Sequence, residues 1–274
     1  MSVSSHPRTT PLRQSLLMVL ATAAAVVAAF FGSGAAGGTA MQETVGGWLG
    51  PDATPLAPGS SAFSIWSVIY AGLVGYAIWQ LSVTARRSAR QHRVRPWAIL
   101  SAVLNAVWLW VVQLGWLGAS VLVMLVLLAV LVRILLLMVA SAAHSRVERL
   151  LTDGTFGLYL GWVSVATAAN IAAWLGARGL EGFQAWEAAA VGVIAVVAAL
   201  GVALGLWTRG RVGPALSIAW GLAWIGEARS EGSFESPLLI LASALAAGAV
   251  LLVPLAVPWM RRAAERRSAS AGTA

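Results

Sequence analysis

The stretch FGLYLGWVSVATAANIAAWL, residues 156–175, decides the fold of this chain. It is long enough to cross a bilayer as a helix, yet it carries polar and aromatic side chains that a helix facing only lipid would not need. Trp162, Ala166 and Asn170 recur at every fourth position and therefore share one face of that helix. An indole, a small residue and an amide on one face indicate one wall of a pocket inside a helical bundle.

The composition of the whole chain is that of a multi-span membrane protein. Of its 274 residues, 59% are hydrophobic and only 10% are charged. The absence of cysteine excludes disulfides, thiol catalysis and cysteine-bound metals. All 18 basic residues are arginines, which also excludes a lysine Schiff base. These arginines lie mostly between apolar runs, so the net charge of +8 points to orientation in a lipid bilayer rather than to nucleic acid.

Apolar runs of the length that a bilayer requires occur eight times along the chain. They cover approximately residues 14–33, 62–84, 97–115, 119–141, 156–176, 186–207, 212–228 and 236–258. The seventh is the weakest, because it is short and Pro214 lies near its start. We therefore predict an all-α integral membrane protein, a bundle of about eight transmembrane helices.

The distribution of arginine predicts how the chain crosses the membrane. Segment 85–96 contains five arginines and is expected to be a cytoplasmic loop. Alternation from that loop places both termini in the cytoplasm and leaves only Arg178 and Arg229 on the opposite side. We expect a multi-pass protein of the cytoplasmic membrane. Alternatively, the first span is a cleaved signal peptide, which would leave seven spans.

Three motifs then occur in order on the second, third and fifth predicted spans. They are FSIWSVIY at residues 63–70, LNAVW at 104–108, and YLGWVS at 159–164 followed by Asn170 and Trp174. Together they resemble the tryptophan-rich sensory protein (TspO) family, which includes the mitochondrial translocator protein. Two departures from the family pattern are one fewer residue between the first aromatic and Trp66, and Leu158 in place of a proline.

This resemblance implies a domain organisation. A short cytoplasmic segment, residues 1–13, would precede a five-helix bundle of the TspO type at 14–176. A three-helix extension at 177–258 and a basic, disordered cytoplasmic tail at 259–274 would follow. Family members often form dimers, so a homodimer is a possible partner. The GxxxG pair in the sixth span fits an intramolecular contact better than a dimer face.

The motif residues also predict a ligand site. Trp66 and Tyr70 share one face of the second span, as do Asn105 and Trp108 in the third. Combined with the face on the fifth span, they would form a cavity that suits a flat, largely apolar ligand with a few polar groups. The predicted ligand-binding residues are Trp66, Tyr70, Asn105, Trp108, Trp162, Ala166 and Asn170. The resemblance implies porphyrins such as protoporphyrin as ligands, for sensing, sequestration or transport, and loop 42–61 would cover the outer mouth.

Other interpretations remain open at this point. The same polar and small residues can simply pack helices together. A secondary transporter using all eight spans would depend on Arg133 or Glu227, and Arg133 could instead extend to the membrane surface or meet an anionic ligand. A porphyrin-modifying enzyme is a third hypothesis, but no phosphate loop, HExxH motif or nucleophile elbow is present. We therefore assign no catalytic residue and expect no metal or cofactor.

Overall fold

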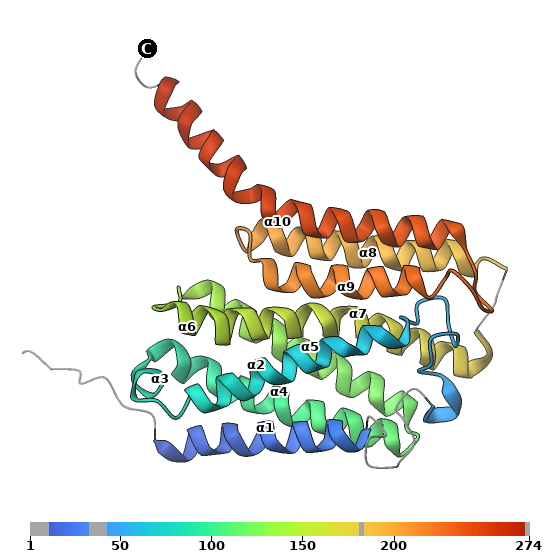
Figure 1. The fold of residues 1–274 in the computed structure, drawn as a ribbon, viewed down its shortest axis with the longest axis horizontal. Helices are drawn as coiled ribbons and strands as arrows, with labels where there is room; N and C mark the ends of the chain where they lie inside the picture. Colours follow the sequence, from blue (N-terminus) through green and yellow to red (C-terminus); the bar gives the residue numbers. More distant parts are fainter. Residues whose placement is uncertain (1–10, 33–42, 181–183, 272–274) are drawn as a thin grey trace, which may run out of the picture. The chain divides into compact units, whose positions relative to one another are not determined.

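The structure, a computed structural model, describes residues 11–32, 43–180 and 184–271, and throughout them it is helical with no strand (Figure 1). The prediction of an all-α membrane fold is confirmed. Seven helices in these ranges are long and apolar enough to cross a membrane. They are α1 (Leu12–Gly32), α2 (Ile65–Trp79, with the turn Ser60–Ser64 before it), α4 (Ala89–Gln113), α5 (Leu117–Ala140), α7 (Thr155–Leu175), α8 (Trp186–Trp207) and α10 (Pro237–Ala271). The seventh predicted span is also helical, but α9 (Val212–Glu227) has only 16 residues.

The chain forms two compact units, each of which is described by itself. Unit 1 contains Met1–Gly47 and Ser64–Phe156, and unit 2 contains Trp48–Phe63 and Gly157–Ala274. The boundary between the units does not fall at residue 176, where the five-helix bundle was expected to end. Most of α7 belongs to unit 2, with the C-terminal helices. The segment before α2 also belongs to unit 2, although it lies between two parts of unit 1 in the sequence.

In unit 1, α1 packs against α2 and α4, and α4 packs against α5. The contact between α1 and α4 is made by small side chains, Ala21 and Ala25 on α1 and Ala102 on α4, all of them buried. Small residues let two helices approach closely, which is how helices associate where lipid removes the usual hydrophobic driving force.

The prediction that residues 85–96 form a loop is wrong, because they are mostly helical. Helix α3 (Val83–Arg87) and the first two turns of α4 occupy this segment, and Ser88 caps α4 by accepting a hydrogen bond from the backbone of Gln91. Two of its five arginines are buried, since Arg90 is 2% exposed and Arg95 is 0% exposed. A count of charges in the sequence assumes that each arginine faces water. Here acidic side chains elsewhere in the chain neutralise Arg90, and Arg95 is hydrogen-bonded.

Arg90 is the centre of a buried ionic cluster. Its Nη1 lies 3.3 Å from Oε1 of Glu148 in α6 (Arg146–Glu148), and its Nη2 lies 2.6 Å from Oδ1 of Asp153 in the π-helical segment η3 (Arg149–Gly154). Its Nε donates to the backbone oxygen of Ser141 at 2.9 Å. The cluster therefore joins the start of α4 to the segment that connects α5 and α7.

Two glutamines extend this cluster into the bundle. Gln91 Nε2 donates to Glu148 at 2.8 Å, and Gln91 Oε1 accepts from Gln80 Nε2 at 2.9 Å and from the Tyr76 hydroxyl at 3.1 Å. Gln80 Oε1 in turn accepts from Nε of Arg95 at 2.7 Å. This polar network fixes the relative position of α2, α4 and η3, because its hydrogen-bonded groups would be costly to bury without their partners.

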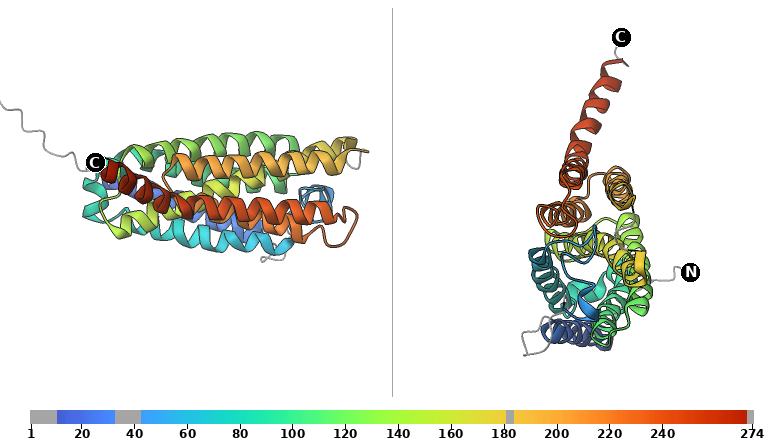
Figure 2. Two further views of the ribbon diagram at one scale, coloured as in Figure 1. Left: turned by 90° about the horizontal axis from the view of Figure 1, so that it is seen from above. Right: turned by 90° about the vertical axis from the view of Figure 1, so that its right-hand side faces the viewer.

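In unit 2, α8, α9 and α10 lie side by side (Figures 1 and 2). A Cβ added at Gly201 would lie 2.9 Å from a methyl group of Val250, and one added at Gly205 would lie 2.6 Å from Cγ of Pro254. The GxxxG pair therefore serves the packing of α8 against α10 within the chain. Gly161 of α7 lies equally close to the backbone of Pro214 at the start of α9.

The tail predicted from residue 259 is helical as far as Ala271, where α10 ends. After Pro258 the sequence is rich in alanine and arginine, both strong helix formers, and the next glycine is Gly272. The segment predicted for residues 1–13 falls mostly outside the described residues.

The buried cluster makes a specific prediction about stability. Arg90→Gln leaves the carboxylates of Glu148 and Asp153 without their cation, and we expect it to lower the free energy of unfolding by about 3–5 kcal/mol. Arg87→Gln, which makes the same change at an exposed position, is expected to alter it by no more than about 0.5 kcal/mol. Thermal or denaturant unfolding of the full chain in detergent measures both. Equal effects of the two substitutions would contradict the assigned role of Arg90.

Candidate functional site

Trp66 and Tyr70, the two ligand-binding residues predicted on α2, contact each other. Trp66 and Tyr70 stack on each other, with ring centroids 5.2 Å apart and an interplanar angle of 25°. Both side chains are partly exposed, so part of their aromatic surface is accessible. An offset stack of this kind provides a flat apolar surface with one hydroxyl at its edge.

Tyr70 links this pair to α4. Its hydroxyl donates a hydrogen bond of 2.6 Å to Oδ1 of Asn105. The structure therefore brings together the second-span and third-span motifs, which are 35 residues apart in the sequence. Trp108 follows one turn later on α4, and both it and Asn105 are buried, at 5% and 1% exposure.

Two donor nitrogens beside this contact lack an acceptor. Within the part of unit 1 that the structure describes, Nδ2 of Asn105 and Nε1 of Trp108 are buried and donate no hydrogen bond. A buried donor without an acceptor costs about 1–3 kcal/mol. Both groups belong to the motifs that sequence reasoning selected as ligand-binding. A ligand that presents acceptor oxygens or nitrogens to α4 would satisfy them.

The remaining three predicted residues lie on α7, in unit 2. Trp162 is 1% exposed and meets the ring of Phe63 edge to face, with centroids 5.7 Å apart and planes at 79°. Asn170 is 2% exposed and Ala166 is partly exposed. Phe63 begins the second-span motif, so this contact joins two of the three motifs.

Two other polar residues of α7 have an ordinary structural role. Ser164 donates to the backbone oxygen of Leu160 at 2.8 Å, and Thr167 donates to that of Val163 at 2.6 Å. Serine and threonine in a helix commonly satisfy their hydroxyls in this way. They therefore do not contribute free polar groups to a site.

The seven predicted residues thus fall into two groups. Trp66, Tyr70, Asn105 and Trp108 lie in unit 1, and Trp162, Ala166 and Asn170 lie in unit 2. Within each unit the residues have the burial and the contacts described above. That both groups line one common hollow stays a prediction.

The proline-rich segment 48–63 is held in unit 2 by residues that follow α9. The guanidinium of Arg229, which is 0% exposed, donates to the backbone oxygens of Pro51 at 2.6 Å and Thr54 at 2.9 Å. Burial lowers the pKa of this guanidinium, and the nearby Asp52 carboxylate opposes that shift. In return, Asp52 accepts hydrogen bonds from the backbone and the hydroxyl of Ser233, at 2.7 and 2.9 Å.

Two tryptophans of α9 hold the other end of the same segment. The indole nitrogen of Trp220 donates to the backbone oxygen of Ala62 at 2.9 Å, and the backbone nitrogen of Gly59 donates to the backbone oxygen of Trp224 at 3.0 Å. The three sequence motifs include neither Trp220 nor Trp224, so the sequence did not predict this role. Arg229 was assigned only to a membrane side, because no sequence signal points to backbone oxygens as partners.

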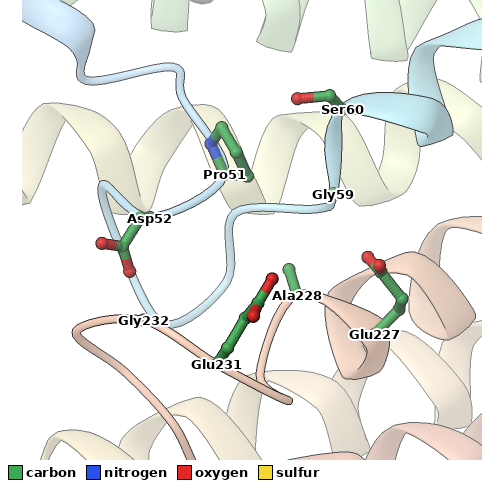
Figure 3. A pocket seen from close by; sticks show the side chains of 8 residues that line it. All are labelled: Pro51, Asp52, Gly59, Ser60, Glu227, Ala228, Glu231 and Gly232. Carbon is green, nitrogen blue, oxygen red and sulfur yellow. The ribbon is translucent and has the colours of Figure 1, made fainter.

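A pocket of about 490 Å³ opens beside this segment in unit 2. Its lining residues are Pro51, Asp52, Gly59, Ser60, Glu227, Ala228, Glu231 and Gly232. Figure 3 shows the carboxylates of Glu227 and Glu231 on either side of Ala228, whereas Asp52 turns toward Gly232. Nowhere in the described ranges do three histidine, cysteine or acidic side chains gather in a way that could hold a metal ion. We therefore assign no metal to this pocket.

Comparison with known proteins identifies the family. The model of the family described as TSPO-like protein matches residues 14–257. Neither a search of curated proteins nor a search of solved structures found a match. The matched region contains all eight predicted spans, and so extends well beyond residue 176, where the resemblance noted in the sequence ended. The chain belongs to the TSPO-like protein family.

Proposed function

We propose that this membrane protein binds a planar, largely apolar ligand of the porphyrin class, which it senses, sequesters or transports. The observation that carries the proposal is the pair of buried donors, Asn105 Nδ2 and Trp108 Nε1, beside the stacked rings of Trp66 and Tyr70. The class of ligand follows from the resemblance to the tryptophan-rich sensory proteins and is compatible with membership of the TSPO-like family.

The chemistry of this surface matches such a ligand. A porphyrin offers a flat aromatic face and carboxylate oxygens at its edge. The exposed faces of Trp66 and Tyr70 can stack on the flat face of the porphyrin. The two donors on α4 can then bind the carboxylate oxygens. A hydrogen bond to a charged acceptor contributes about 1.5–3 kcal/mol. Tyr70 keeps the Asn105 amide oriented by donating to its oxygen, so that the NH₂ group faces away.

The residues of α7 complete the proposed site. Trp162 would provide a second aromatic wall, Ala166 the space beside it, and Asn170 a further amide for the polar edge of the ligand. The loop at residues 42–61, in which Arg229 binds the backbone oxygens of Pro51 and Thr54, would cover the outer mouth.

Binding can be tested with substitutions that differ only in which face of α4 they change. We expect Trp108→Leu to weaken protoporphyrin binding at least tenfold, because it removes a buried donor and an aromatic surface. Trp110→Leu is the matched control, since Trp110 is 56% exposed on the same helix, and it should change the affinity less than twofold. The shift of the porphyrin absorbance band on titration of the full chain reports binding without depending on tryptophan fluorescence.

The same titration examines the wider site. Trp66→Ala and Trp162→Ala should each weaken binding by a similar factor. If both variants bind protoporphyrin as well as the unmodified protein does, the proposed pocket is wrong. An effect of Trp66→Ala alone would restrict the site to unit 1.

We further propose that both termini face the cytoplasm and that the protein resides in the cytoplasmic membrane. Although Arg90 and Arg95 are buried, Arg86, Arg87 and Arg93 remain at the same end of unit 1 and retain its basic character. An excess of arginine on one side favours the cytoplasmic orientation of that side.

The lack of cysteine allows a direct test of this orientation. His144→Cys introduces a thiol where the native side chain is 80% exposed, and Ser230→Cys introduces one at an exposed position after α9. In intact cells, a membrane-impermeant maleimide should label the second variant and not the first. Labelling of His144→Cys alone would reverse the proposed topology.

A further inference from the structure

Arg133 is a charged side chain on the lipid-facing surface of a membrane-spanning helix. It is the only charged residue in α5, and it is exposed. Its helical stripe consists otherwise of exposed apolar side chains, including Leu122, Val126 and Leu136. Seven residues separate it from Ala140, so its Cα lies about 10 Å below the end of the helix. A guanidinium at that depth must reach toward the membrane surface or find an anion.

The neighbouring helix α4 supplies an aromatic partner at a matching depth. The guanidinium of Arg133 lies over the ring of Trp97, 5.8 Å from its centroid. Helices α4 and α5 are joined by the short turn at residues 114–116 and pack against each other, so the start of α4 and the end of α5 lie at the same end of unit 1. Trp97 follows the start of α4 by eight residues, which is about 12 Å.

A second exposed arginine lies one helical turn closer to that end. Arg93 precedes Trp97 by four residues and therefore shares its face of α4. Below Trp97 this face continues with Leu100, which is exposed, and Leu104, which is partly exposed. No ion pair joins Arg93 or Arg133 to a carboxylate in the described part of unit 1, where Glu148 and Asp153 pair with Arg90 instead. The surface thus carries two positive charges near one end of unit 1 and an apolar stripe next to them.

We propose that Arg93, Trp97 and Arg133 form a binding site for an anionic phospholipid. The two guanidinium groups bind its phosphate, because their planar donor geometry matches phosphate oxygens. The indole of Trp97 lies at the boundary between head group and acyl chain, where tryptophan is favoured. The acyl chains follow the exposed stripes of α4 and α5. This site is independent of the proposed porphyrin pocket.

Native mass spectrometry of the full chain in detergent tests the site. The protein is incubated with equal amounts of phosphatidylglycerol and phosphatidylcholine that carry the same acyl chains. We expect the unmodified protein to retain phosphatidylglycerol preferentially. Arg133→Gln and Arg93→Gln should each reduce that preference about fivefold, the effect of one basic residue near an anionic lipid surface. Arg87→Gln is the matched control and should leave the preference unchanged, because this exposed arginine lies on α3.

A second measurement covers the case in which a variant is poorly folded. Phosphatidylglycerol should raise the thermal unfolding midpoint of the unmodified protein and of Arg87→Gln, but not that of Arg133→Leu, whose new side chain suits a lipid-facing position. Equal retention of the two lipids by the unmodified protein would overturn the proposal. So would an equal loss of preference in Arg87→Gln and Arg133→Gln.

Discussion

Burial of polar groups inside a helical membrane protein is the constraint on which this structure depends. A buried hydrogen-bonding group has no water to satisfy it, so leaving it without a partner in the protein is costly. The clearest case is the cluster in which Arg90 meets Glu148 and Asp153, and in which Gln91 and Gln80 continue the connection to Arg95. Against that background, the buried donors of α4 that lack a partner are the observation from which we propose a ligand site.

The hydropathy of the sequence predicted the helices well, because length and apolar content are sufficient to identify a span. The fifth predicted span, 156–176, agrees with α7 to within one residue at each end. The i,i+4 relation also predicted that Trp66 and Tyr70 share one face of their helix, where the structure shows them stacked on each other. What it could not supply was the hydrogen bond between Tyr70 and Asn105, which depends on how two helices pack rather than on the spacing within one of them.

The arginines show most clearly where sequence reasoning ends. All five in segment 85–96 look alike in the sequence, yet Arg90 and Arg95 are buried whereas Arg87 and Arg93 are exposed. The partner that decides the position of Arg90 is Glu148, which is 58 residues away. Likewise, Arg229 was counted as an exposed charge but binds two backbone oxygens of the segment before α2. Contacts across such distances leave no local signature.

The proposed function depends on one contact, that of the α4 donors with a bound ligand. Nuclear magnetic resonance of the protein with ¹⁵N-labelled tryptophan indoles tests it directly, because each indole N–H gives its own signal, assigned by substitution. On addition of protoporphyrin, the Trp108 signal should move downfield as its proton enters a hydrogen bond, and the Trp110 signal should stay in place. A Trp108 signal that does not change at saturating protoporphyrin would contradict this proposal.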